Sequence, residues 1–398
     1  MLTNSPTTCQ TVRMARTAVI IGCGSIATAH AYGFVASGVV DLVGLADIHR
    51  GALDELGTSC GVPEEGRFTD YRAMLDAVRP DIVVICLWHE LHTEAVRAAA
   101  SRGVGVILCE KPIASNLGDA QAMMVAAQRE GVKFAVAHQR RFYPGWAEAR
   151  RLLAEGAIGR PSHVRLEVRD GILNSGTHSV DLARFVLGDP AAISVTGSVQ
   201  RSTDRFERGV RIEDSALGMV ELENSTRIFL ESDIAAEGLV SANAVITGTE
   251  GLMAIEENHV RLMNAASGGW RTVSGSPFGS AAARPAPVHT LAEPLYRLIA
   301  HFGTAAIDEF VENFVRQARS LVAWLDGEID DHPGDGRHGY AALEILMAIY
   351  ESTRLHEVTR LPLATRLNPL DLLVESGALP VLRPGAYDIR ANLVRGEA

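Results

Sequence analysis

Residues 18–30 read AVIIGCGSIATAH, and this stretch decides the fold. A short apolar run enters a glycine turn, and a helical pattern begins directly after it. The turn matches the dinucleotide-binding fingerprint Gly22-x-Gly24-x-x-Ala27, with alanine in place of the third glycine. Gly22 permits the tight turn, and Gly24 lets the backbone approach a pyrophosphate at the helix N-terminus. The residues that we expect at the cofactor here are Gly22, Gly24, Ser25 and Ile26.

A carboxylate follows the second predicted strand. Leu42–Ala46 ends on Asp47, about 20 residues past the glycines, as the fingerprint requires. Asp47 can accept hydrogen bonds from both hydroxyls of the adenosine ribose and would repel a 2′-phosphate, which favours NAD over NADP. Arg50 keeps NADP open, because an arginine just beyond can pair with that phosphate. A strand–turn–helix that binds no phosphate, with a solvated Asp47, is the other alternative.

Size and composition limit the class of protein. The 398 residues suffice for two domains, each with its own core. Acidic residues outnumber basic ones by 48 to 37, for a net charge of −11, which argues against nucleic acid or an anionic membrane as the main partner. No apolar run approaches membrane-spanning length. We expect residues 1–15, which are polar, to form a disordered leader.

The cysteines indicate the compartment. Five occur, without CxxC spacing, and three of them sit at the ends of apolar strands, where a free thiol behaves as a small hydrophobe. A reduced cytoplasmic protein is the simplest interpretation.

Strand and helix patterns alternate as far as His138. This alternation predicts a doubly wound parallel sheet in residues 16–138, which is a Rossmann domain. The apolar run 81–87 is typical of a strand buried on both faces. Ligands bind beyond the carboxyl ends of such strands, so we expect the glycine turn, Asp47, residues 87–92 and residues 110–112 to meet at one edge.

Past His138 the pattern changes. Helices at 146–155 and 178–187 are followed by strands of period two between residues 192 and 263, which predicts a large open sheet, antiparallel or mixed, with one face free for a partner. Two further helices are expected at 307–326 and 340–356, after a long loop at 268–288. Residues 139–398 thus form a second, α+β domain, in which we expect 361–398 to be an irregular tail.

The chain contains two lysines, Lys111 and Lys133, and every other basic residue is arginine. A retained lysine can do what arginine cannot, such as lose its proton. Lys111 stands at the carboxyl end of a central strand, where it faces the nicotinamide. Its ammonium can stabilise the alkoxide that develops as hydride leaves a secondary alcohol, and partial desolvation can lower its pKa. A surface lysine on a loop is the alternative.

Several motifs occur together in a known order. They are Gly22-x-Gly24-x-x-Ala27, Glu110-Lys111-Pro112, Arg140-Arg141-Phe142, Gly176-x-His178-x-x-Asp181 and a closing helix at 341–351. In this respect residues 16–355 resemble the glucose–fructose oxidoreductase and inositol dehydrogenase family, called Gfo/Idh/MocA. The resemblance implies NAD(P)-dependent redox chemistry on sugars, cyclitols or related polyols. It also implies a C-terminal domain for substrate binding, and dimers or tetramers packed through its sheet.

The resemblance also assigns residue roles. Glu110 and Lys111 would lie at the cofactor, with Lys111 also catalytic, and the Lys111–Pro112 bond is often cis in relatives. His178 would be the general acid/base, a role that suits a pKa near neutrality. A histidine that merely caps or packs is the alternative for His178.

The sequence departs from the family pattern four residues before His178. Many relatives carry an aspartate there, paired with the histidine, whereas this chain has Asn174. Without that carboxylate His178 would be a weaker base, or Lys111 would carry more of the proton transfer. Asp181, one helical turn on, could face His178 instead. We expect a substrate site formed by Lys111, Arg141, Asn174, His178 and Asp181.

The loop 87–92, LWHELH, takes the place of a Thr-Pro-Asn-x-x-His loop in the family. We expect Leu87, Trp88 and His92 at the cofactor. His89 and His92 invite a metal site, but no third ligand follows at a suitable spacing, so we expect none. Arg140 and Arg141 would bind a substrate phosphate or carboxylate, or else brace the domain interface.

The resulting hypothesis is an NAD-dependent dehydrogenase that oxidises a secondary alcohol of a sugar, aminosugar or cyclitol to a ketone. Such ketones commonly feed transaminases, so an aminosugar or aminoglycoside pathway is conceivable by association. Two rivals stay open, namely a glycosidase-like enzyme that uses NAD transiently and a non-catalytic dinucleotide-binding sensor. Retention of Lys111 and His178 speaks against the sensor.

Overall fold

A computed structural model describes residues 15–234, 244–256, 259–274 and 307–388. The predicted leader lies outside the described residues, apart from Ala15. The elements of the first half are β1 (Arg16–Ile21), α1 (Ser25–Ser37), β2 (Val40–Ala46), α2 (Arg50–Ser59), β3 (Arg67–Phe68), α3 (Tyr71–Val78), β4 (Ile82–Ile85), α4 (His89–Ala100), β5 (Val106–Cys109), α5 (Leu117–Arg129) and β6 (Lys133–Val136).

The elements of the second half are α6 (Pro144–Ala154), β7 (Pro161–Val168), α7 (Thr177–Val186), β8 (Ala192–Gln200), β9 (Thr203–Glu207), β10 (Val210–Arg211), β11 (Ser215–Leu222), β12 (Arg227–Ser232), β13 (Ala244–Gly248), β14 (Gly251–Ile255), β15 (His259–Asn264), β16 (Arg271–Ser274), α9 (Ile307–Leu325), α10 (Gly336–Leu355), β17 (Thr359–Arg360), α11 (Pro369–Glu375) and β18 (Arg383–Asp388).

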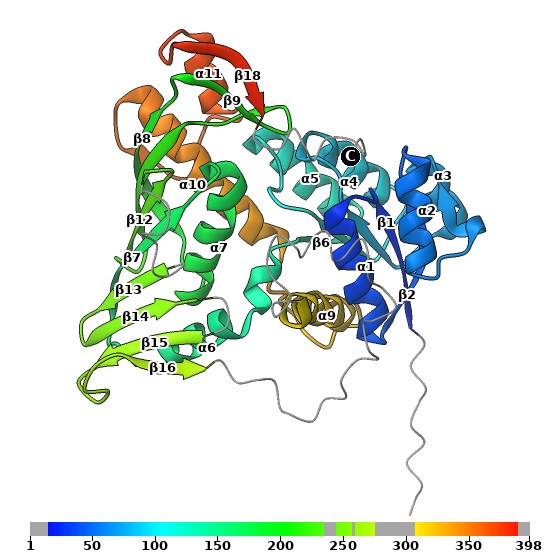
Figure 1. The fold of residues 1–398 in the computed structure, drawn as a ribbon, viewed down its shortest axis with the longest axis horizontal. Helices are drawn as coiled ribbons and strands as arrows, with labels where there is room; N and C mark the ends of the chain where they lie inside the picture. Colours follow the sequence, from blue (N-terminus) through cyan, green and yellow to red (C-terminus); the bar gives the residue numbers. More distant parts are fainter. Residues whose placement is uncertain (1–14, 235–243, 257–258, 275–306, 389–398) are drawn as a thin grey trace, which may run out of the picture.

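The N-terminal sheet has the order β3-β2-β1-β4-β5-β6, and all its strands run parallel. Successive side chains of each strand point to opposite faces of the sheet, so each strand contributes to two apolar layers. One layer packs under α3, α4 and α5, and the other packs under α1, α2 and α9. This arrangement confirms the predicted Rossmann architecture (Figure 1).

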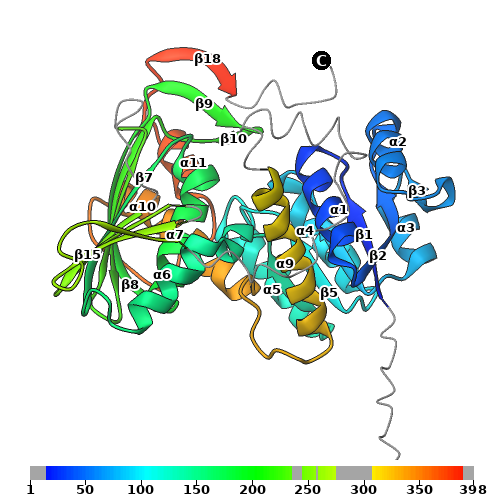
Figure 2. The same ribbon diagram turned by 60° about the horizontal axis from the view of Figure 1, so that its bottom comes forward.

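Helix α9 covers part of the N-terminal sheet although it lies far along the chain. Its Ala318, Leu321 and Trp324 share a core with Ile20 of β1 and Leu108 of β5. This helix was expected in the second domain, because an amphipathic pattern shows that a helix buries one face but does not show which element it packs against. Figure 2 shows α9 lying beside α1.

The second domain is built on a nine-stranded sheet of order β16-β15-β14-β13-β7-β12-β11-β8-β17. Only β7 and β12 among these strands pair in parallel. Helices α6, α7 and α10 lie on the face that looks toward the Rossmann domain, as Figure 1 shows. The large, mostly antiparallel sheet that the sequence predicted is thus confirmed.

Several shorter elements were not predicted. The described part of the expected irregular tail contains α11 and β18, and the described part of the expected loop at 268–288 contains β16. The remainders of both segments, 389–398 and 275–288, lie outside the described residues. Strand β18 pairs in parallel with β9, which pairs with β10, so these three form a small separate sheet. Helix α4 begins at His89, within the stretch 87–92 that was expected to be a loop. No helix in the described part of the chain is long and apolar enough to cross a membrane.

A glycine fixes the close approach of α1 and α9. A Cβ added to Gly33 would lie 2.5 Å from Cβ of Phe314 and 2.8 Å from its carbonyl carbon. We therefore predict that Gly33→Ala forces the helices apart and lowers the free energy of unfolding by about 1–3 kcal/mol. Urea denaturation would measure this loss in the free energy of unfolding.

The matched control for that substitution is Gly51→Ala, because a Cβ at Gly51 of α2 meets nothing within 4 Å. This variant should be as stable as the wild type or slightly more so. Equal stability of the two variants would contradict the packing argument.

Candidate active site

The glycine turn after β1 has the form that a bound dinucleotide requires. Gly22 has a φ of 90°, and a Cβ there would lie 2.5 Å from the carbonyl oxygen of Cys86. Gly24 is the N-cap of α1, and a Cβ on it would meet nothing within 4 Å. Free space therefore lies beside Gly24 at the N-terminus of α1, where the first N–H groups of the helix, which include those of Ser25 and Ile26, can bind a pyrophosphate.

Asp47 lies beside this turn. Its Oδ2 accepts a hydrogen bond from the Cys23 amide at 2.7 Å, and its Oδ1 accepts one from the His49 amide at 2.7 Å. A carboxylate has further lone pairs, so these bonds orient Asp47 without exhausting its capacity for ribose hydroxyls. Arg50 is paired with Asp54 at 3.0 Å and with Glu64 at 3.1 Å. Because two acids already engage Arg50, the geometry favours NAD over NADP.

The loop between β4 and α4 is braced by a buried histidine. His92 places Nε2 3.0 Å from the carbonyl oxygen of Leu87 and Nδ1 3.1 Å from that of Ile113. Since both of its ring nitrogens contact backbone carbonyl oxygens, His92 holds the two loops together beside the predicted cofactor site. Trp88 is partly exposed at the start of α4.

Lys111 follows β5 at the carboxyl edge of the sheet, and its bond to Pro112 is cis. Glu110 anchors this loop, because its buried carboxylate bonds Nε2 of His30 at 2.8 Å and accepts the Lys111 amide at 3.1 Å. The Lys111 ammonium donates to Oδ1 of Asn174 at 3.1 Å and lies 3.4 Å from the Asn174 carbonyl oxygen. Partial burial lowers the pKa of Lys111 to about 8.

Asn174 belongs to a π-helical turn, Ile172–Gly176, that leads into α7. Two carboxylates fix the backbone entering this turn. Asp233 accepts the amides of Asp170 and Gly171 at 3.0 and 2.9 Å, and Glu213 accepts the amide of Ile172 at 2.6 Å. Single-turn π-helices are frequent at functional sites. Here the turn presents Asn174 to Lys111.

His178 lies in the first turn of α7 and is almost completely buried. Its Nδ1 has no hydrogen-bond partner among the described residues. Burial, followed by the positive charges of Lys111 and Arg140, holds the pKa of His178 well below its ordinary value. His178 is therefore a neutral imidazole at pH 7, with a lone pair that can accept a proton.

Asp181 does not face His178, in contrast to the alternative that we considered. Its carboxylate accepts Nε and Nη2 of Arg141, both at 2.8 Å, and lies 2.9 Å from Nδ1 of His138. Burial opposes the charge, but Arg141 and His138 hold the pKa of Asp181 well below its usual range. Arg141 also bonds Asp189 at 2.7 Å. Both predicted substrate residues thus belong to a buried ionic network, in which they brace the fold.

The neighbouring arginine has the free side chain. Arg140 is half-buried, and no hydrogen bond or ion pair holds its guanidinium within the described ranges. Its positive charge lowers the pKa of both Lys111 and His178. Of the adjacent pair, Arg141 is engaged by carboxylates, whereas the guanidinium of Arg140 has no such partner in that part of the chain.

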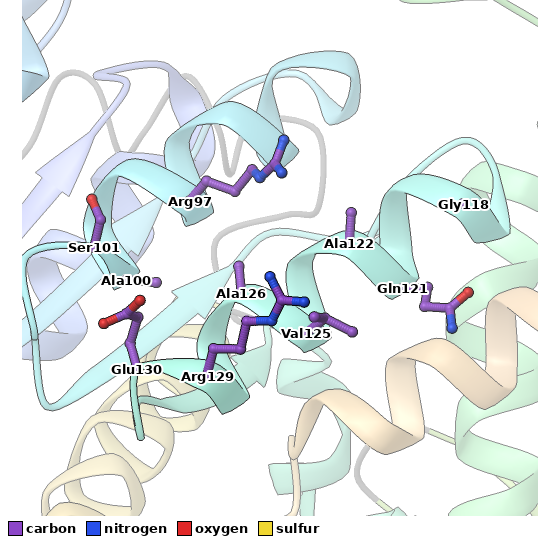
Figure 3. A pocket seen from close by; sticks show the side chains of 10 residues that line it. All are labelled: Arg97, Ala100, Ser101, Gly118, Gln121, Ala122, Val125, Ala126, Arg129 and Glu130. Atoms are coloured by element: carbon purple, nitrogen blue, oxygen red, sulfur yellow. The ribbon is translucent and has the colours of Figure 1, made fainter.

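These residues meet at the boundary of the two domains. Lys111 comes from the Rossmann edge, Asn174 and His178 come from the second domain, and Arg140 comes from the segment between them. A separate hollow of about 550 Å³ lies between α4 and α5 (Figure 3). That hollow is lined by Arg97, Arg129 and mostly small residues, and contains none of the residues above. In the described ranges no group of three or more His, Cys, Asp or Glu could hold a metal.

Comparison with known proteins agrees with this geometry. Residues 16–138 match a model described as an oxidoreductase family with an NAD-binding Rossmann fold, and residues 171–254 match the GFO/IDH/MocA C-terminal domain. Together the matches cover just over half of the chain. The chain belongs to the Gfo/Idh/MocA oxidoreductase family. It is an oxidoreductase of CH–OH groups whose Rossmann domain binds NAD.

Individual relatives act on sugars and cyclitols. The chain is 28% identical to D-apiose dehydrogenase from Paraburkholderia graminis, over 65% of this chain and 72% of that one. It is 26% identical to inositol 2-dehydrogenase from Rhizobium meliloti, over 84% of this chain and 95% of that one. Levoglucosan dehydrogenase in complex with NADH shares the fold, with a TM-score of 0.70 at 22% identity, over 88% of this chain and 100% of that one.

The ionic network should matter to stability. Asp181→Asn leaves Arg141 buried with half of its counter-charge, so we predict a loss of about 3–5 kcal/mol in the free energy of unfolding. Glu155→Gln is the control, since its pair with Arg151 is solvent-exposed and should contribute much less to the free energy of unfolding. Thermal or urea unfolding of both variants tests this, and equal losses would contradict the assigned role.

Proposed function

We propose that this enzyme oxidises a secondary alcohol of a sugar or cyclitol to a ketone with NAD, and that Lys111 and His178 handle the alcohol oxygen and its proton. One observation carries the proposal. Lys111, at the edge where the cofactor binds, is held by Asn174, and one helical turn past Asn174 lies a buried, neutral His178 whose Nδ1 is unpartnered among the described residues.

Each residue has a chemical task in this proposal. When bound, NAD supplies the acceptor for the hydride that leaves the carbinol carbon. His178 accepts the hydroxyl proton, which a neutral imidazole can do. The Lys111 ammonium donates to the oxygen as negative charge develops on it. Arg140, with its free guanidinium, binds a further polar group of the substrate. Asn174 orients Lys111 but adds no charge.

The narrower hypothesis of an aminosugar or aminoglycoside substrate rests on the association of such ketones with transaminases. No residue of the site distinguishes an amino from a hydroxyl substituent. The names of the relatives support sugars and cyclitols as the class to test first.

The outer face of the nine-stranded sheet supports a homodimer or homotetramer. Leu217, Met219 and Phe229 are exposed there on adjacent strands, with Met219 directly opposite Phe229. An apolar patch of this kind is a common interface.

We predict that Leu217→Arg shifts the assembly to monomers, as measured by light scattering coupled to size-exclusion chromatography. A wild-type protein that elutes as a monomer would contradict this assignment.

A cytoplasmic setting is supported by the thiols. Cys23, Cys60, Cys86 and Cys109 are free in the structure. Burial raises the pKa of Cys86 and of Cys109 well above its ordinary value, so these thiols are unreactive.

Activity tests the proposal directly. Purified protein is incubated with NAD or NADP, and the absorbance of the reduced cofactor is followed. The substrate panel consists of apiose, levoglucosan, myo-inositol, free sugars, sugar nucleotides and aminoglycoside intermediates. We predict NAD-dependent reduction with one class of polyol and a fall in kcat/KM of about 100-fold or more in Lys111→Ala. Lys133→Arg is the control for the other lysine. Tight NAD binding without net formation of NADH would instead indicate transient hydride use or a sensor. Analysis of the products would then distinguish these two.

The pH dependence follows from the two pKa shifts. The pKa of Lys111 is lowered to about 8, so the ammonium is present below that pH and is lost above it. His178 stays neutral at pH 7, because its pKa is depressed. We predict that kcat/KM for oxidation is level near neutrality and falls above about pH 8. Lys111→Arg should abolish that fall, and an identical alkaline limb in this variant would contradict the role of Lys111.

A further inference from the structure

Helix α10 runs from the Rossmann domain to the nine-stranded sheet (Figure 1). Its first turns pack against β6, since a Cβ added to Gly339 would lie 2.6 Å from Cγ2 of Val136. Toward its other end, Ile349 packs as closely on the sheet, since a Cβ added to Gly197 of β8 would lie 2.5 Å from the Ile349 carbonyl oxygen. Close packing at both ends fixes where the side chains of α10 lie relative to the two domains.

Tyr350, the residue after Ile349 in α10, is completely buried. Its hydroxyl donates a hydrogen bond of 2.5 Å to Oε2 of Glu213, a length in the range of charge-assisted O–H···O⁻ bonds. Burial and the charge of Glu213 raise the pKa of Tyr350 well above its ordinary value, so the hydroxyl keeps its proton and remains the donor. Helix α10 therefore holds one oxygen of the Glu213 carboxylate.

Glu213 is also completely buried, and its second oxygen is engaged as well. Oε1 accepts a hydrogen bond from the Ile172 amide at 2.6 Å, and Ile172 is the first residue of the π-helical turn that carries Asn174. Burial raises the pKa of Glu213, and a buried carboxylate is costly unless both oxygens are bonded. The retention of a carboxylate here indicates a task for both of its oxygens.

The π-helical turn connects this carboxylate to the active site. Asn174 lies two residues past Ile172, and its Oδ1 and carbonyl oxygen lie 3.1 and 3.4 Å from the Lys111 ammonium. Because a hydrogen bond is lost beyond about 3.5 Å, a shift of the turn by about 1 Å would separate Oδ1 from the ammonium. The contact between Lys111 and Asn174 thus depends on where Glu213 holds the turn.

We propose that Tyr350 and Glu213 are positioning residues of the active site, which transmit the fixed position of α10 to the π-helical turn and so hold Asn174 at Lys111. Neither is a catalytic residue, because both act through the backbone of the turn. The alternative is that the pair only stabilises the second domain. The positioning needs no substrate, whereas its consequence for catalysis rests on the proposed function.

The composition of the chain allows the surroundings of Lys111 to be followed directly. Because Lys111 and Lys133 are the two lysines, full-length protein labelled with ε-¹³C lysine gives two side-chain NMR signals, and Lys133→Arg assigns them. Asn174→Ala provides the reference position of a Lys111 signal that has lost its side-chain partner. We predict that Tyr350→Phe and Glu213→Leu both shift the Lys111 signal toward this reference.

Glu213→Gln is the conservative variant. Its side-chain oxygen can accept the Ile172 amide, and its nitrogen can donate to the Tyr350 hydroxyl oxygen. The Lys111 signal should therefore stay close to its wild-type position. Rescue by glutamine but not by leucine would show that the hydrogen bonds at this site, rather than the filled volume, hold the turn.

The matched control is Ser352→Ala on the same helix. Ser352 is buried, and its hydroxyl donates to the Glu357 carbonyl oxygen at 2.6 Å and accepts the Gly197 amide at 3.0 Å. This variant also removes buried hydroxyl bonds from α10 but leaves the contacts of the π-helical turn in place. Its melting temperature should fall while the Lys111 signal stays unchanged.

The proposal is overturned if the Lys111 signal keeps its wild-type position in folded Tyr350→Phe and Glu213→Leu protein, or if Ser352→Ala shifts it as far. Thermal unfolding shows whether each variant is folded. If Glu213→Leu does not fold, Tyr350→Phe decides, because it removes a single oxygen atom.

Steady-state kinetics give the catalytic readout. We predict that Tyr350→Phe lowers kcat about 10-fold, with the KM for NAD unchanged, since a misplacement of about 1 Å can cost about 100-fold in rate. Added to Asn174→Ala, the same substitution should have little further effect, because both act at one contact. Additive losses would contradict the proposed path. If no polyol is oxidised by the wild type, the proposed function fails, whereas the NMR spectra still decide whether Tyr350 and Glu213 hold Asn174 at Lys111.

Discussion

The hydrogen bond between the Lys111 ammonium and Oδ1 of Asn174 joins the two halves of the site. Lys111 depends on a loop at the end of β5 that Glu110 anchors to His30 of α1. Asn174 depends on a π-helical turn whose entry is held by Glu213. Neither half can perform the chemistry alone, so the relative placement of the domains is the constraint that the rest of the structure serves.

Buried charge enforces that placement. Arg141 lies in the turn Gln139–Phe142, directly after the last Rossmann strand β6, and is held by Asp181 and Asp189 farther along the second domain. Such a network adds little net stability compared with apolar packing, but breaking it is costly, because a buried charge loses its partner. Helix α9 adds an apolar contribution, since it closes one face of the Rossmann sheet with residues from far along the chain. The site therefore lies between two bodies that are tied both by ions and by a shared core.

Much of this was predictable from the sequence, and the exceptions have physical reasons. The Rossmann strands and the positions of Lys111 and His178 follow from strong local patterns, namely buried apolar runs and short motifs at strand or helix ends. The adjacent residues Arg140 and Arg141 could not be told apart, because they lie in an irregular turn where no periodicity fixes which side chain points inward. Asp181 was misjudged for a related reason, since helical spacing places it near His178 but does not reveal the buried partners Arg141 and His138.

The small sheet of β9, β10 and β18 was missed because its strands are short and largely polar. A tight-turn signal was present in Arg208-Gly209, and it could have revealed the hairpin but not the position of the hairpin in the molecule. That position depends on the packing of the whole second domain. The same holds for helix α9, because its amphipathic pattern was evident in the sequence but the sheet against which it packs was not.

The central claim is that hydride leaves a carbinol carbon of a polyol as Lys111 and His178 manage the oxygen. The most direct measurement uses myo-inositol, apiose and levoglucosan deuterated at their carbinol carbons, with NAD and mass spectrometry of the recovered cofactor. The account predicts reduced cofactor that carries one deuterium, together with the matching ketone. A bound cofactor that gains no deuterium, with every polyol unchanged or converted without label transfer, would contradict it.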